Sequence, residues 1–157
     1  MGQFKFEVKG GPPKVGLNLA GNIDEDTDFS QINLAGSSEV EIDLEKVKSI
    51  NSCGIREWIK WLGTVPQAKF YFSNCPKVIV DQINLVDGFL PKTSKVVSFY
   101  VPYYNDDEGS EKNVLFKYGA EFTEGQVKPP AKVQDEAGNE MEMDVIEAKY
   151  FAFIKRM

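Results

Sequence analysis

The sequence predicts an α/β fold followed by a smaller β-rich extension, and two observations point to this class. Over residues 2–90, segments with alternating apolar residues are interleaved with segments whose apolar residues recur at helical spacing, a pattern typical of sheets with parallel strand pairs. Beyond about residue 93, strand-like segments follow one another without such helices. We therefore expect one domain over residues 1–93 and a β-hairpin-rich extension over residues 94–157 that ends in an amphipathic segment.

The first half of the predicted domain begins with a hairpin. Residues 3–9 and 14–21 alternate apolar and polar positions on either side of a Gly-Gly-Pro-Pro turn. The acidic residues 24–28 favour the start of a short helix that runs through Ile32, because carboxylates stabilise helix amino termini. Residues 39–44 alternate again and predict the next strand.

Two helices and one strand complete the predicted domain. The first helix carries an apolar stripe at i, i+3, i+4 and i+7 and ends before Gly63 and Pro66. A strand over residues 68–72 follows, and a second helix runs from about Lys77 to Gly88. The stripe of the first helix consists of Ile55, Trp58, Ile59 and Leu62.

The extension is expected to contain a second hairpin. Residues 95–104 and 112–118 are strongly strand-like and are separated by a polar turn. Residues 121–138 are polar and contain Pro129-Pro130, which predicts a loop. Residues 141–154 are amphipathic, and we expect a strand and then a helix there.

Composition excludes several classes of function. The chain of 157 residues has 42% hydrophobic residues, but its apolar windows are too short to span a bilayer, so we expect no membrane insertion. A net charge of -6 without a basic cluster makes nucleic acid an unsuitable partner. The first residues lack the pattern of an export signal, which predicts a cytoplasmic protein whose Cys53 and Cys75 are free thiols.

The residue inventory also argues against catalysis. The chain has no histidine, which removes the commonest general base and the commonest metal ligand. No base, nucleophile and orienting group occur together, so we expect neither an enzyme nor a bound cofactor.

Four local patterns follow one another over about 90 residues. They are Leu19-Ala20-Gly21-Asn22-Ile23-Asp24, Val40-Glu41-Ile42-Asp43-Leu44, Ile50-Asn51-Ser52-Cys53-Gly54-Ile55, and Phe72-Ser73-Asn74-Cys75-Pro76-Lys77-Val78 with Leu85-Val86-Asp87-Gly88-Phe89. Together and in this order, they resemble a STAS domain, the fold of anti-sigma factor antagonists. The resemblance implies a mixed β-sheet with helices packed on one side. It also implies a bacterial signalling protein that regulates transcription by binding an anti-sigma factor or a regulatory serine kinase, as a monomer or weak dimer.

The third segment resembles the family's switch loop, whose hydroxyl a partner kinase phosphorylates. Ser52 occupies that place, whereas Asn51 stands where the family prefers Asp. A phosphate at a helix amino terminus is compatible with the free amides there and would repel an acidic partner surface. The alternative is purely structural, because Asn51 or Ser52 can simply cap the following helix.

The resemblance places the partner-binding surface on this loop, the start of the helix and the neighbouring segment. Trp61 lies off the apolar stripe, so we expect it to be half exposed and to contact the partner, since interface anchors are enriched in Trp. The predicted partner-binding residues are Asn22, Asp24, Asn51, Cys53, Gly54, Ile55, Trp58 and Trp61.

The extension faintly resembles a zinc ribbon that lacks its metal ligands. Residues 105–109 and 134–138 each have the two-residue gap and following Gly of a zinc knuckle, but cysteine is missing at or near positions 105, 108, 134 and 137. We therefore predict no zinc, and two ordinary polar turns are the alternative interpretation.

Two other functions remain open on the sequence. One is a constitutive scaffolding subunit whose STAS-like surface is permanently occupied, for example by the extension folding back on it. The other is a small-ligand sensor that uses a groove between the domain and the extension, although the sequence shows no convergent polar set for it.

Overall fold

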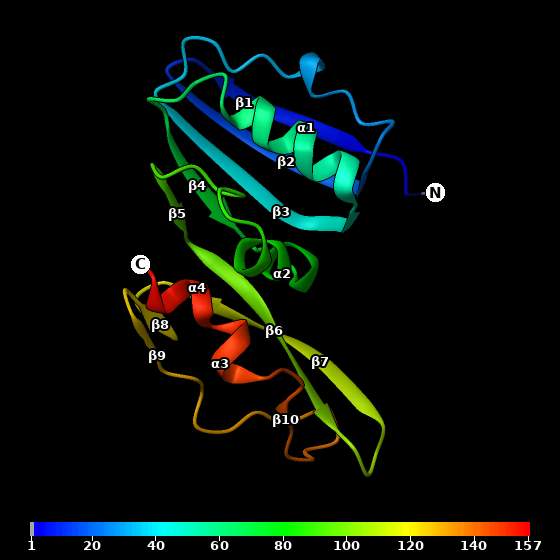
Figure 1. The fold of residues 1–157 in the computed structure, drawn as a ribbon. Coiled ribbons are helices and arrows are strands. Elements are labelled where there is room, and N and C mark those ends of the chain that lie inside the picture. Colours follow the sequence, from blue (N-terminus) through cyan, green and yellow to red (C-terminus); the bar gives the residue numbers. More distant parts are fainter. Residues whose placement is uncertain (1) are drawn as a thin grey trace.

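The amino-terminal half of the chain forms a five-stranded mixed sheet in a computed structural model that describes residues 2–157 (Figure 1). The strands lie side by side in chain order, the first pair being antiparallel and the other three pairs parallel. They are β1 (Lys5–Gly11), β2 (Lys14–Ile23), β3 (Glu39–Ile50), β4 (Lys69–Ser73) and β5 (Ser94–Val96). A mixed α/β fold with a mixed sheet is thus confirmed.

The alternation read from the sequence separates the two faces of this sheet. On β2, Val15, Leu17 and Leu19 are buried, whereas the residues between them are half-buried. The buried face is covered by α1 (Ser52–Leu62), which connects β3 to β4 (Figure 1). The period-two pattern therefore fixes which face receives the helix.

Two further connections complete this half. A single 3₁₀ turn, η1 (Phe29–Gln31), lies between β2 and β3, where a short helix was expected, and the Asp28 side chain caps it. Helix α2 (Lys77–Leu85) connects β4 to β5. Among residues 2–157, no helix is both long enough and apolar enough to cross a membrane.

The carboxy-terminal half is built on the predicted hairpin, β6 (Ser98–Asn105) and β7 (Ser110–Lys117), to which β10 (Glu142–Met143) adds beside β6. The segment expected to be a loop contains a small two-stranded ribbon, β8 (Phe122–Thr123) and β9 (Gln126–Val127). Two short helices, α3 (Glu147–Tyr150) and α4 (Ala152–Lys155), end the chain. Their aromatic residues pack around the buried Phe99 of β6.

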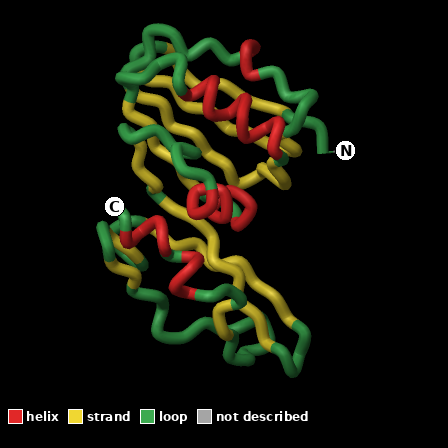
Figure 2. Tube along the Cα trace, in the orientation of Figure 1, coloured by secondary structure: helices red, strands yellow, loops and turns green. Residues whose placement is uncertain are grey.

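The two halves share one continuous stretch of extended chain, visible as the yellow tube that runs from the upper to the lower sheet in Figure 2. The expected single strand over residues 95–104 is divided at Val97, because residues up to Val96 pair with β4 while Ser98 pairs with Lys117 of β7. The predicted boundary at residue 93 precedes β5, and β5 belongs by hydrogen bonding to the first sheet.

Candidate functional site

The loop that precedes α1 is fixed to the end of β2 by the backbone and side chain of Asn51. The backbone N–H of Asn51 donates to the carbonyl oxygen of Ile23 over 3.1 Å. The side-chain Oδ1 accepts from the backbone N–H of Gly54 over 2.9 Å, which makes Asn51 the N-cap of α1. The structural interpretation of the cap therefore holds for Asn51.

Asn51 also uses the other end of its amide. Its Nδ2 donates to Oε2 of Glu25 over 2.8 Å. This hydrogen bond is the largest cause that holds the pKa of Glu25 below its ordinary value. An aspartate at position 51 could also cap α1, but its carboxylate could not donate a hydrogen bond to Glu25. The hydrogen bond to Glu25 therefore requires the asparagine.

Gly54 allows α1 to approach β2 closely. A Cβ atom at residue 54 would lie 2.2 Å from the Ile23 carbonyl oxygen and 2.7 Å from its carbon. Both are backbone atoms, so no side-chain rotation relieves the contact. Glycine at this position thus sets the distance between the loop and the strand end.

Ser52 is the first residue of α1, and its side chain is exposed. No side-chain hydrogen bond of Ser52 is found among residues 2–157, since Asn51 already supplies the cap. Arg56 and Lys60 follow at intervals of four residues and are also exposed, so the three side chains lie along one face of the helix. The sequence signal for these two cations is their spacing of four and eight residues from Ser52.

Asn22, near the end of β2, and Asp24, just after the strand, flank Ile23, whose carbonyl oxygen accepts from Asn51. Asn22 accepts from the Ser49 hydroxyl over 2.8 Å, and Asp24 accepts from the backbone N–H of Asp26 over 3.0 Å. Both residues line a cavity of about 420 Å³ whose rim also carries Asp26 and Asp28. The structure therefore brings an acidic rim close to the amino terminus of α1.

The expectation that Trp61 is half exposed is wrong. Trp61 is only 5% exposed, its indole Nε1 donates to the carbonyl oxygen of Ile32 over 3.0 Å, and its ring stacks on Phe29 at 4.5 Å. The η1 turn covers the flank of α1 that helical periodicity leaves outside the apolar stripe. Trp58 is fully buried and donates to the carbonyl oxygen of Phe89 over 2.9 Å, so neither indole offers a contact surface.

The predicted residues thus divide into two groups. Gly54, Trp58 and Trp61 are buried and support the helix from beneath, and Ile55 is half-buried against the core. Cys53 is half-buried, and the Arg56 guanidinium lies 3.6 Å from its sulfur. The accessible predicted residues of this region are Asn51, Ser52 and Cys53; together with the exposed Arg56 and Lys60, which were not predicted, they form what we name the α1 surface.

The extension does not cover the α1 surface. Its elements β6, α3 and α4 pack against α2, whereas α1 lies across the sheet above α2 (Figure 1). The Asn84 side chain joins the two halves, because it donates to the carbonyl oxygen of Tyr150 and accepts from the backbone N–H of Phe153, each over 2.9 Å. The scaffolding alternative in which the extension folds back onto the STAS-like surface therefore does not apply.

The two knuckle-like turns of the extension lie next to each other. The Asn105 side chain donates to the carbonyl oxygen of Glu140 over 2.7 Å, and the Ser110 hydroxyl donates to Asp135 over 2.8 Å. Gly109 and Gly138 both have positive φ, at 65° and 86°, as such turns require. Among residues 2–157 no three His, Cys, Asp or Glu side chains converge in a way that would hold a metal ion.

Comparisons with known proteins leave the family of this chain open. No protein-family model matches the sequence, and no curated protein matches it either. The resemblance to STAS domains stays a prediction, and function has to be inferred from the α1 surface itself.

Proposed function

We propose that the protein is a regulatory protein-interaction module that binds a protein partner through the α1 surface and releases it when Ser52 is phosphorylated. One observation carries this proposal: Asn51 caps α1, so the exposed Ser52 hydroxyl is not needed to hold the helix. A residue that is dispensable for folding, accessible and placed at the start of a surface helix is suited to modification.

The position tolerates a phosphate. At the amino terminus of a helix of 11 residues, a charge of about -1.5 to -2 interacts favourably with the positive end of the helix dipole. Arg56, four residues along the same face, supplies a cation for it. We therefore expect phosphorylation to change the interface without unfolding the domain.

The phosphate would also alter what a partner meets. Unmodified, the α1 surface presents Arg56 and Lys60 to a partner, with Glu25 hydrogen-bonded to Asn51 at one end and Glu57 paired with Lys60 over 3.6 Å at the other. A dianion on Ser52 neutralises the nearest cation and must be desolvated when a partner docks, which disfavours binding. By the resemblance, the partner is an anti-sigma factor or a regulatory serine kinase.

The alternative is a constitutive scaffolding module, and the Asn51–Glu25 hydrogen bond favours it. This bond keeps a carboxylate next to the loop, where it opposes an added phosphate, and Asn51 replaces the Asp typical of the resembling family. In this case a partner occupies the α1 surface whatever the state of Ser52.

Partner capture with substituted chains separates the two functions. Immobilised Ser52→Ala and Ser52→Glu chains are exposed to lysate of the source organism, captured proteins are identified by mass spectrometry, and the purified partner is titrated against each chain by calorimetry. Gln126→Glu, an exposed position on β9, is the control for the added negative charge. We expect the partner to bind Ser52→Ala and Gln126→Glu equally and Ser52→Glu at least about tenfold more weakly.

Equal affinity of all three chains would refute the switch and leave the scaffolding function. A partner that binds as well after Arg56→Gln and Lys60→Gln substitution would refute the α1 surface as the binding site.

A further inference from the structure

Strand β1 forms one edge of the five-stranded sheet, and its outer side is unpaired. It pairs with β2 along its whole length, and no other strand in the described part of the chain pairs with it. Residues 24–38, which lead from β2 to β3, make no backbone hydrogen bond with β1. An open edge of this length is a template for a further strand. It is separate from the α1 surface and independent of the function proposed for that surface.

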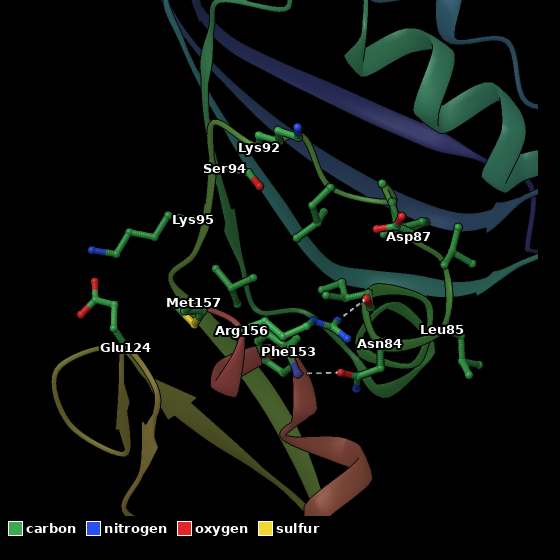
Figure 3. A pocket seen from close by; sticks show the side chains of 16 residues that line it. Asn84, Leu85, Asp87, Lys92, Ser94, Lys95, Glu124, Phe153, Arg156 and Met157 are labelled. Carbon is green, nitrogen blue, oxygen red and sulfur yellow. Dashed lines mark hydrogen bonds between the residues drawn. The ribbon is translucent and has the colours of Figure 1, made fainter.

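The opposite edge of the sheet offers no comparable template. Strand β5 has only three residues, and the ammonium group of its central Lys95 lies 3.6 Å from the ring centroid of Tyr118 in the extension. Figure 3 shows the same ammonium group beside the carboxylate of Glu124, which also accepts a hydrogen bond from the Tyr118 hydroxyl. The extension therefore already occupies the side of β5, whereas nothing in the chain occupies the outer side of β1.

One face of β1 carries charges of alternating sign. Lys5, Glu7 and Lys9 pair with the residues of β2 that point away from α1, and all three are exposed. Among residues 2–157, none of them forms an ion pair within 4.0 Å. Charged side chains commonly keep edge strands apart, but a row of one sign does so best. Alternating sign instead allows one strand to attract another in a suitable register.

The other face of β1 is apolar and incompletely covered. Val8 lies opposite the buried Leu17 of β2, yet 47% of its surface is exposed. Phe6 lies opposite the buried Leu19 and is half-buried against the core. Val8 thus continues the apolar face of the sheet to its open edge, where a neighbouring strand would cover it.

An antiparallel second copy of β1 satisfies both faces in one register. When Val8 lies opposite Val8 of the second copy, all seven residues of β1 are paired. Glu7 then lies opposite Lys9 of the second copy, and Lys9 opposite its Glu7, which gives two pairs of opposite sign. On the apolar face the two Val8 side chains meet, and Phe6 covers Gly10 of the second copy.

The neighbouring registers are less favourable. A register centred on Glu7 places this residue opposite its own copy and Lys5 opposite Lys9, so like charges face one another throughout. A register centred on Phe6 places Lys5 opposite Glu7 but pairs only residues 5–7 of β1 with each other. Charge and strand length therefore favour the same register, the one centred on Val8.

We propose that the protein forms a homodimer by antiparallel pairing of β1 with β1 of a second copy, centred on Val8. The pairing joins two five-stranded sheets into one. Equivalent side chains of the two copies point to the same face, so both α1 helices lie on the same side of the joined sheet. Because one pair of strands buries little surface, we expect a weak dimer that dissociates on dilution.

Sedimentation velocity of the full chain, over a dilution series from about 500 µM to about 1 µM, measures the association. We expect the sedimentation coefficient to rise with concentration towards that of a dimer. Glu7→Lys and Lys9→Glu each place like charges opposite one another and should weaken dimerisation about tenfold or more. Glu111→Lys, the same change of charge at an exposed position on β7, is the control and should leave dimerisation unaltered.

Charge exchange tests the register. Glu7→Lys/Lys9→Glu restores opposite charges across the axis and should recover dimerisation. An equimolar mixture of the Glu7→Lys chain and the Lys9→Glu chain should also associate, because each supplies the charges that the other lacks. Lys5→Glu/Glu7→Lys restores them only in the register centred on Phe6, so we expect this chain to remain as weak as Glu7→Lys. Thermal melts by circular dichroism verify that every variant is folded.

Several results would overturn the proposal. They are a parental chain that stays monomeric up to about 500 µM, equal weakening by Glu7→Lys and Glu111→Lys, and no recovery in Glu7→Lys/Lys9→Glu. Recovery by Lys5→Glu/Glu7→Lys instead would refute the register centred on Val8. If Glu7→Lys alone does not fold, the comparison of Lys9→Glu with Glu7→Lys/Lys9→Glu decides in its place.

Discussion

Replacement of Gly54 by alanine tests the close approach on which the position of the 51–54 loop depends. The added methyl group would meet two backbone atoms of Ile23, at 2.2 and 2.7 Å, so α1 or the end of β2 must move. Overpacking of this kind costs about 1–3 kcal/mol, and a contact with backbone lies at the upper end of that range. Alanine recovers about 1 kcal/mol through its higher helix propensity, which leaves a net loss of about 2 kcal/mol.

Urea denaturation of Gly54→Ala and Gly16→Ala measures this loss. Gly16 lies on β2, and a Cβ there would be 3.7 Å from its nearest neighbours on Lys9, an ordinary contact distance. We expect Gly16→Ala to keep the parental free energy of unfolding while Gly54→Ala loses about 2 kcal/mol. If Gly54→Ala is as stable as Gly16→Ala, α1 does not depend on glycine for its position and the described geometry of the loop is wrong.

Two further predictions concern single carboxylates. Asn51→Asp keeps the cap of α1 but places a second carboxylate against Glu25, so we expect a lower urea midpoint at pH 7. Adding Glu25→Gln should restore the midpoint in a double-mutant cycle. Additive effects of the two substitutions would contradict the Asn51–Glu25 hydrogen bond. The Ser110 hydroxyl, and after it the Asn139 backbone N–H, hold the pKa of Asp135 below its ordinary 3.8. Because the folded pKa is lowered, the stabilising contribution of Asp135 is complete above pH 3.8 and is lost as the pH falls through the folded pKa. NMR titration of the Asp135 carboxyl carbon checks this, since Ser110→Ala should raise the midpoint, and a parental midpoint at or above 3.8 would exclude the network.

The helices and strands of the first half could be predicted because the apolar residues of each one recur at the spacing typical of a helix or of a strand. The alternation on β2 and the stripe of α1 follow from neighbours in the chain, and both elements occur where the sequence places them. Apolar spacing did not predict the first residues of α1. Ser52 and Cys53 belong to the helix because Asn51 caps it at this point, and not because they extend the apolar stripe.

Contacts between segments that are distant in the chain could not be predicted from this single sequence. Trp61 is off the apolar stripe of its own helix, yet η1, which comes earlier in the chain, covers it. The division of the strand at Val97 depends on where β4 ends and β7 begins, and residues 94–105 themselves contain no turn signal. Likewise, Arg156 reaches the carbonyl oxygen of Ile83 only because the end of the chain lies against α2, where Asn84 binds the backbone of Tyr150 and Phe153.

The direct passage from β5 into β6 has a consequence for how the chain can be divided. The backbone N–H of Val97 donates to the carbonyl oxygen of Phe72 in β4, and the backbone N–H of Cys75 donates to the carbonyl oxygen of Ser98 in β6. The point where β5 passes into β6 is therefore hydrogen-bonded both to β4 and to the segment that follows β4. A protein cut at residue 93 would lose the Val97 bond and the β5 pairing, and the open edge of β4 would invite aggregation. The two halves are therefore joined by backbone hydrogen bonds as well as by the chain itself, and fragments of this chain are poor substitutes for the whole.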